Sequence, residues 1–90
     1  MKQYTIIISG RVQGVGFRFS ARENARKFNI KGYVMNQSNG DVKIVAEGQE
    51  ENLDNYLSWC REGPPHAWVD NVSIQKSDEV SNYKHFDIKH

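Results

Sequence analysis

The order of the predicted strands and helices limits the possible folds of this chain more than any other feature. Apolar residues recur with a period of two where a strand is expected and with a period near 3.6 where a helix is expected. These patterns predict strands at residues 3–9, 32–36, 42–47 and 68–75, a short strand around Phe86 and Ile88, and helices at 17–28 and 50–62. The order strand, helix, strand, strand, helix, strand is typical of the split βαβ arrangement. We therefore expect an α+β, ferredoxin-like sandwich whose antiparallel sheet has four to five strands.

The two predicted helices each carry a single apolar face. In the first helix this face is formed by Phe17, Ala21, Ala25 and Phe28, and in the second by Leu53, Tyr56, Leu57 and Cys60. A helix with one apolar face buries that face against a neighbouring layer, so both helices are expected on one side of the sheet. Between the second and third strands, Asn39-Gly40 indicates a two-residue hairpin turn.

Length and charge restrict the kind of partner. The 90 residues are expected to form one domain, residues 1–90. The 12 basic and 11 acidic residues are interspersed and give a net charge of +1. Nucleic acid selects extended basic surfaces, so no nucleic-acid partner is expected. A small anionic ligand needs only one local cluster of donors, and that class remains open.

Cysteine and histidine content gives no sign of a metal or a cofactor. Cys60 is the only cysteine, which excludes an intramolecular disulfide, and its place on the apolar helix face predicts a core residue. His66, His85 and His90 lack metal-ligand spacing. No signal peptide or membrane-spanning run is recognised. We predict a cytoplasmic monomer without membrane, metal or cofactor, in which Trp59 and Trp68 pack at the margin of the core.

The segment SGRVQGVGFRFS, residues 9–20, joins the first predicted strand to the first predicted helix. At a helix start the backbone N–H groups lack intrahelical partners and favour an anion. Gly14 and Gly16 can adopt the positive φ that lets such groups converge. Arg18, in the first helical turn, can reach back over the same concavity. The residues alone are equally compatible with a plain glycine-rich turn, and they do not fit the phosphate-loop or dinucleotide patterns.

Two blocks of sequence resemble the acylphosphatase family. The first is GRVQGVGFR at residues 10–18, and the second is GYVMN at 32–36, followed by Gly40-Asp41-Val42. Weaker matches are Gly48, Gly63-Pro64-Pro65, Ala67 and Val69, so the resemblance covers almost the whole chain. Met35 and Ala21 depart from residues common in the family, which bears on rate and affinity.

The resemblance implies a hydrolase that cleaves the carboxyl–phosphate bond of acyl phosphates without metal, by direct attack of water on phosphorus. It implies that Arg18 binds phosphate and that Asn36 orients the attacking water. The cradle for the phosphate would be formed by Gln13, Gly14, Val15, Gly16, Phe17 and Arg18. Inorganic phosphate would then be both product and inhibitor, whereas Arg11 is expected to be a solvated loop residue.

Two non-catalytic alternatives share this element order. RNA-recognition modules carry an aromatic run on the third strand, but here the run GVGFRF precedes the first helix and the third predicted strand has no aromatic residue. A sensor that binds a phosphate ligand without hydrolysing it would keep the cradle. The sequence does not indicate which acyl phosphate is the physiological substrate.

Overall fold

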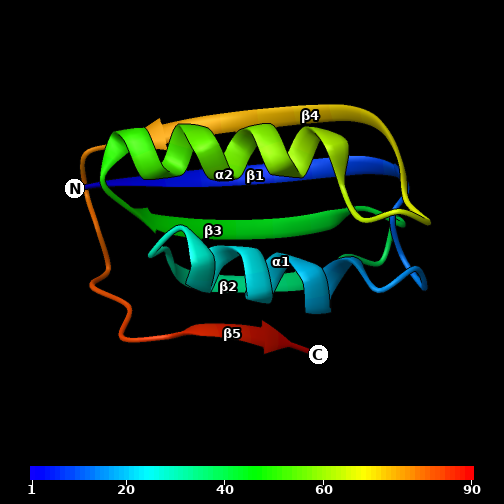
Figure 1. Ribbon diagram of the computed structural model, residues 1–90, viewed down its shortest axis with the longest axis horizontal. Coiled ribbons are helices and arrows are strands. Elements are labelled where there is room, and N and C mark those ends of the chain that lie inside the picture. The colour runs from blue at the N-terminus through cyan, green and yellow to red at the C-terminus, as the bar shows by residue number, and fades with distance from the viewer.

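The computed structural model describes all 90 residues and has the element order expected from the sequence (Figure 1). Five strands and two helices follow one another as β1 Lys2–Arg11, α1 Phe17–Lys27, β2 Lys31–Asn36, β3 Val42–Gly48, α2 Glu50–Glu62, β4 Trp68–Ser77 and β5 Phe86–Lys89. The prediction of an α+β, ferredoxin-like arrangement is confirmed. None of the helices is long and apolar enough to cross a membrane.

The sheet has the strand order β4-β1-β3-β2-β5 and is mixed rather than antiparallel throughout. The four strands of the split βαβ core pair antiparallel, as expected, but β5 pairs parallel with β2. The reason is the path of the chain (Figure 1). After β4 the segment 78–85 runs along the end of the sheet at which β2 begins, so β5 starts at that end and runs in the direction of β2.

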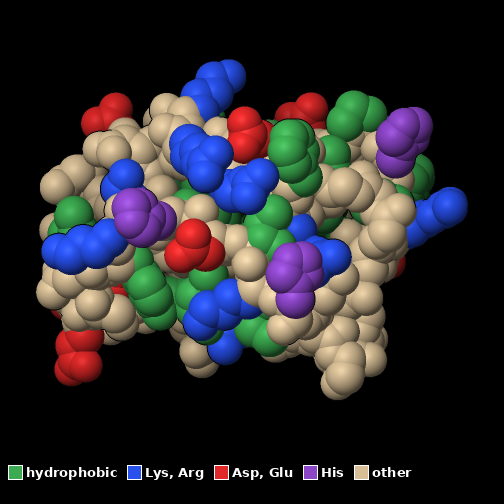
Figure 2. All heavy atoms as spheres, turned by 90° about the horizontal axis from the view of Figure 1, so that it is seen from below, with side chains coloured by type: hydrophobic (Ala, Val, Ile, Leu, Met, Phe, Trp, Pro, Cys, Tyr) green, Lys and Arg blue, Asp and Glu red, His purple; other side chains and the backbone are tan.

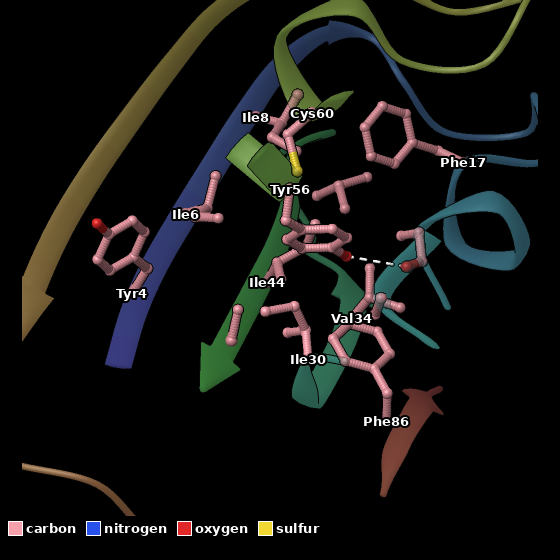
Figure 3. Packing of buried hydrophobic residues seen from close by; sticks show 14 of the residues in the cluster. Tyr4, Ile6, Ile8, Phe17, Ile30, Val34, Ile44, Tyr56, Cys60 and Phe86 are labelled. Carbon is pink, nitrogen blue, oxygen red and sulfur yellow. Dashed lines mark hydrogen bonds between the residues drawn. The ribbon is translucent and has the colours of Figure 1, made fainter. Parts of the chain in front are cut away.

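Both helices cover the same face of the sheet and enclose the core between the two layers (Figures 1 and 3). The predicted apolar helix faces are confirmed, because Phe17, Ala21 and Ala25 of α1 and Leu53, Tyr56 and Cys60 of α2 are buried. From the sheet, alternate residues such as Ile6, Ile8 and Ile44 are fully buried. The Tyr56 hydroxyl donates a 2.9 Å hydrogen bond to the Ala21 carbonyl and links the helices (Figure 3).

The strand β3 is more deeply buried than its alternating sequence indicates. Val42, Ile44 and Ala46 face the helices as expected, yet Glu47, on the opposite face, is only 1% exposed. The cause is the segment 78–85, whose backbone N–H groups at Ser81 and Tyr83 donate to the Glu47 carboxylate. Glu47, a polar residue in the alternating pattern of the strand, therefore holds a distant loop in place through hydrogen bonds.

Two local predictions were wrong. The turn after β2 is not a two-residue hairpin, because the last paired residues are Asn36 and Val42. The Asn39 side chain accepts a hydrogen bond from the Asp41 backbone N–H, which stabilises the wider turn. Trp68 does not pack at the core margin but is 71% exposed. Its neighbour Val69 packs against the core, so strand alternation turns Trp68 outward.

Candidate active site

The site begins with the loop between β1 and α1. Gly14 and Gly16 have φ angles of 74° and 79°, and Gly16 is the residue at the helix start. A side chain at either position would meet no atom within 4 Å, so the requirement for glycine comes from the backbone conformation. No side chain caps α1 and its first turn has no acidic residue. The N–H groups at the start of α1 are therefore available to an anion.

A pocket of about 200 Å³ opens beside this helix start. It receives residues from the glycine loop, from the first turn of α1, from the end of β2 and from the β5 edge of the sheet. Its lining is formed by Val12, Gly14, Gly16, Phe17, Arg18, Phe19, Asn36, Ile88 and His90. The lining thus combines backbone and side-chain donors with apolar side chains.

Most of the residues expected from the sequence meet at this pocket. Gly14, Gly16, Phe17, Arg18 and Asn36 line it, whereas the predicted cradle residues Gln13 and Val15 do not. Val15 packs against the hydrophobic core instead. Arg11 is exposed and lies outside the pocket, as expected, but it is the last residue of β1 rather than a loop residue.

The Gln13 side chain has a connecting role that the sequence did not indicate. Its Nε2 donates hydrogen bonds of 2.8 Å to the carbonyl oxygens of Gln37 and Asp41. These two residues lie in the turn that follows β2. Gln13 therefore joins the glycine loop to the turn beside Asn36 and holds the two halves of the site together.

Asn36 is the last residue of β2, two positions after the buried Val34. Strand alternation places it on the helix-covered face of the sheet, where it lines the pocket. Its Oδ1 is buried and has no hydrogen-bond partner in the protein. An unpaired buried acceptor is costly, and native structures rarely keep one without a reason. Asn36 itself lines the pocket, so a ligand there is the candidate partner for this acceptor.

Arg18 lies in the first turn of α1 and forms no ion pair with any carboxylate. Its Nη1 lies 3.2 Å from Nδ1 of His90. A guanidinium has five N–H donors, so a single contact leaves most of them free for an anionic ligand. No group of three or more His, Cys, Asp or Glu side chains is positioned to hold a metal ion.

Cys60 is excluded as the nucleophile by its surroundings. The thiol is fully buried in the core, and burial raises the pKa of Cys60 far above its ordinary value. A protonated thiol is a poor nucleophile. The prediction that Cys60 is a packing residue is confirmed.

Four pocket residues were missed by the sequence interpretation: Val12, Phe19, Ile88 and His90. Ile88 and His90 continue the alternation that begins at the buried Phe86, which is the signal that could have placed them on the helix-covered face. Phe19 follows no apolar pattern and is 58% exposed. Nothing in the local sequence indicates that it faces the pocket.

Comparisons with known proteins point to one family. The profile of the Acylphosphatase family matches residues 4–88. An acylphosphatase of Archaeoglobus fulgidus is 48% identical over 83 residues, which cover 92% of each chain, and one of Bacillus licheniformis is 40% identical over the full length of both. The crystal structure of acylphosphatase from Bacillus subtilis superimposes with a TM-score of 0.98 at 38% identity and covers both chains completely.

Proposed function

The chain belongs to the acylphosphatase family, and from this premise we propose that it hydrolyses acyl phosphates in the pocket beside α1. The products are a carboxylate and inorganic phosphate. Residues 1–90 are taken as one domain of this kind, because the family match spans nearly all of them. A monomeric, cytoplasmic enzyme remains our prediction from the sequence.

One observation supports the assignment of the part of the pocket that binds the phosphoryl group. Arg18, the uncapped start of α1 and Asn36, whose buried Oδ1 has no hydrogen-bond partner, all line the same small pocket. A phosphoryl group carries negative charge on several oxygens, and an arginine fork beside free backbone N–H groups matches it. We assign phosphate binding to Arg18 and to the backbone at Gly14, Gly16 and Phe17. Gln13 and Val15 belong to the same loop and support its shape.

The role of Asn36 follows from its free acceptor. A water molecule that donates one hydrogen bond to Oδ1 is held with a lone pair free to attack phosphorus. As the new P–O bond forms, the bond between phosphorus and the carboxylate oxygen breaks and its electron pair leaves with the carboxylate. The proton lost by the water passes to a phosphoryl oxygen. A carboxylate leaves without being protonated, so positioning and charge stabilisation carry the catalysis.

The apolar part of the pocket suits the acyl end of the substrate. Phe19 and Ile88 present carbon surface beside the polar groups. An exposed aromatic side chain gains from covering apolar ligand surface. We therefore expect activity toward acyl phosphates with aromatic or aliphatic acyl groups.

The decisive experiment is hydrolysis of a simple aryl acyl phosphate by purified protein, with and without a chelator. We expect turnover that the chelator does not change, with competitive inhibition by inorganic phosphate. A folded protein that binds phosphate but shows no turnover would favour the second candidate, a phosphate-ligand sensor. Dependence on an added metal ion would contradict the metal-free mechanism.

A further inference from the structure

Arg18 has one side-chain hydrogen-bond partner in the protein, His90, and this contact lies in the pocket. Nη1 of Arg18 and Nδ1 of His90 are 3.2 Å apart. A guanidinium can only donate hydrogen bonds, so Nδ1 of His90 is the acceptor and the ring proton lies on Nε2. We infer that His90 is a positioning residue, which holds the Arg18 guanidinium ready for the phosphoryl group.

The sheet places His90 beside the other proposed site residue as well. β5 runs parallel to β2 with Val34 opposite Ile88 and Met35 opposite Lys89. The same register, continued by one residue, places His90 next to Asn36. Figure 2 looks onto the side of the molecule where β5 and α1 lie and shows histidines and basic side chains exposed on this face.

Strand alternation explains why the imidazole faces α1. Phe86 is buried under the helices, Ile88 lines the pocket, and His90 follows two residues later on the same face. Between them, Asp87 and Lys89 are exposed. The parallel pairing of β5 therefore has a consequence for the site, because an absent or antiparallel β5 would not deliver residue 90 to the helix start.

The physical effect of the contact is to order a flexible side chain before the ligand arrives. An arginine side chain loses considerable rotamer freedom when a ligand fixes it. If the side chain is already held in place before the ligand binds, less of this entropy is lost on binding. The contact with His90 occupies one of the five N–H groups. Because the arrangement serves the bound substrate and the transition state alike, its loss is expected to appear in KM more than in kcat.

The test uses three variants in a hydrolysis assay with an aryl acyl phosphate, and it rests on the proposed function because it requires turnover. His90→Leu removes the acceptor, whereas His90→Asn keeps an acceptor oxygen near the position of Nδ1. His66→Leu is the control, since His66 is exposed and lies outside the pocket. We expect His90→Leu to raise both KM and the inhibition constant of inorganic phosphate about three- to tenfold, with kcat within about twofold. His90→Asn should restore most of the affinity.

Three results would overturn the inference. These are unchanged KM and phosphate inhibition in His90→Leu, a His90→Asn variant that binds as weakly as His90→Leu, or a loss of kcat at constant KM, which would indicate direct chemistry by His90.

If the wild-type protein shows no turnover, the proposed function fails but the contact between Arg18 and His90 can still be tested. The NMR signal of the Arg18 side chain should then shift in His90→Leu, return in His90→Asn and stay unchanged in His66→Leu. No shift in His90→Leu would reject the positioning role.

Discussion

The two ends of the sheet treat buried polar groups in opposite ways. At one end, the Glu47 carboxylate accepts hydrogen bonds from Gln3 Nε2 and from the backbone N–H groups of Ser81 and Tyr83. At the other end, Asn36 Oδ1 has no partner and the start of α1 has no cap. An unpaired buried acceptor costs about 1–3 kcal/mol. The satisfied end stabilises the fold, and the unsatisfied end leaves hydrogen-bonding groups without partners in the protein.

The largest effect is expected at the unsatisfied end. Arg18→Ala and Asn36→Ala should each lower kcat/KM about 10²- to 10³-fold, because each removes a group that we propose acts on the reacting atoms. The free energy of unfolding, measured by urea denaturation, should change by less than about 0.5 kcal/mol in Arg18→Ala, and it should not fall in Asn36→Ala, which removes the unpaired buried acceptor. Arg11→Ala is the matched control and should keep wild-type rates. Wild-type turnover in either site variant would show that its role is assigned wrongly.

The opposite outcome is expected at the satisfied end. Glu47→Gln replaces an oxygen acceptor by a donor within a network of donors, so one buried hydrogen bond is lost and the loop 78–85 is weakened. We expect a loss of about 1–3 kcal/mol in the free energy of unfolding, with kcat nearly unchanged. Glu62→Gln, at an exposed position, is the control. A variant as stable as the wild type would mean that the carboxylate does not hold the loop.

The pH dependence of stability tests the same network. Burial alone would raise the pKa of Glu47, but the hydrogen bonds from Ser81, Gln3 and Tyr83 outweigh it and hold the pKa below the ordinary 4.5. Because the pKa is lower in the folded state, the carboxylate stabilises the protein above the unfolded-state pKa. This contribution is lost as the pH falls through the folded-state pKa.

The measurement is urea denaturation of the wild type and Glu47→Gln at several pH values between 7 and 3. The stability difference between the two proteins should shrink as the pH falls through the acidic part of this range, because the wild type alone loses the ionised carboxylate. A difference that stays constant down to pH 3 would contradict the assignment of the lowered pKa to this network.

The smallest effect concerns the backbone of the glycine loop. Gly16→Ala places a side chain in open space but at a φ of 79°, so the cost is conformational, about 1 kcal/mol of unfolding free energy. Gly16→Asn should cost less, because asparagine tolerates this region better than alanine does. Both can be compared by thermal or urea denaturation. Equal losses in the two variants would point to crowding rather than to backbone strain.

Much of the site could be predicted because its residues lie in two short segments. The residues 10–18 and 32–36 carry the glycines, Arg18 and Asn36, and the structure brings these segments to one pocket. The side-chain role of Gln13 could not be predicted, since it depends on carbonyl groups 24 and 28 residues away. His90 was missed for the same kind of reason, because its partner Arg18 is 72 residues distant.

By itself, the sequence determined the order of the strands and helices, the buried face of each helix and the two blocks of the site. These features depend on local periodicity and backbone conformation, which neighbouring residues impose on one another. Only the tertiary structure decided that β5 pairs parallel with β2, that Glu47 is buried and that His90 reaches Arg18. All three features depend on the path that segment 78–85 takes around the end of the sheet. Such a path joins distant parts of the chain and produces no periodic pattern in the residues that form it.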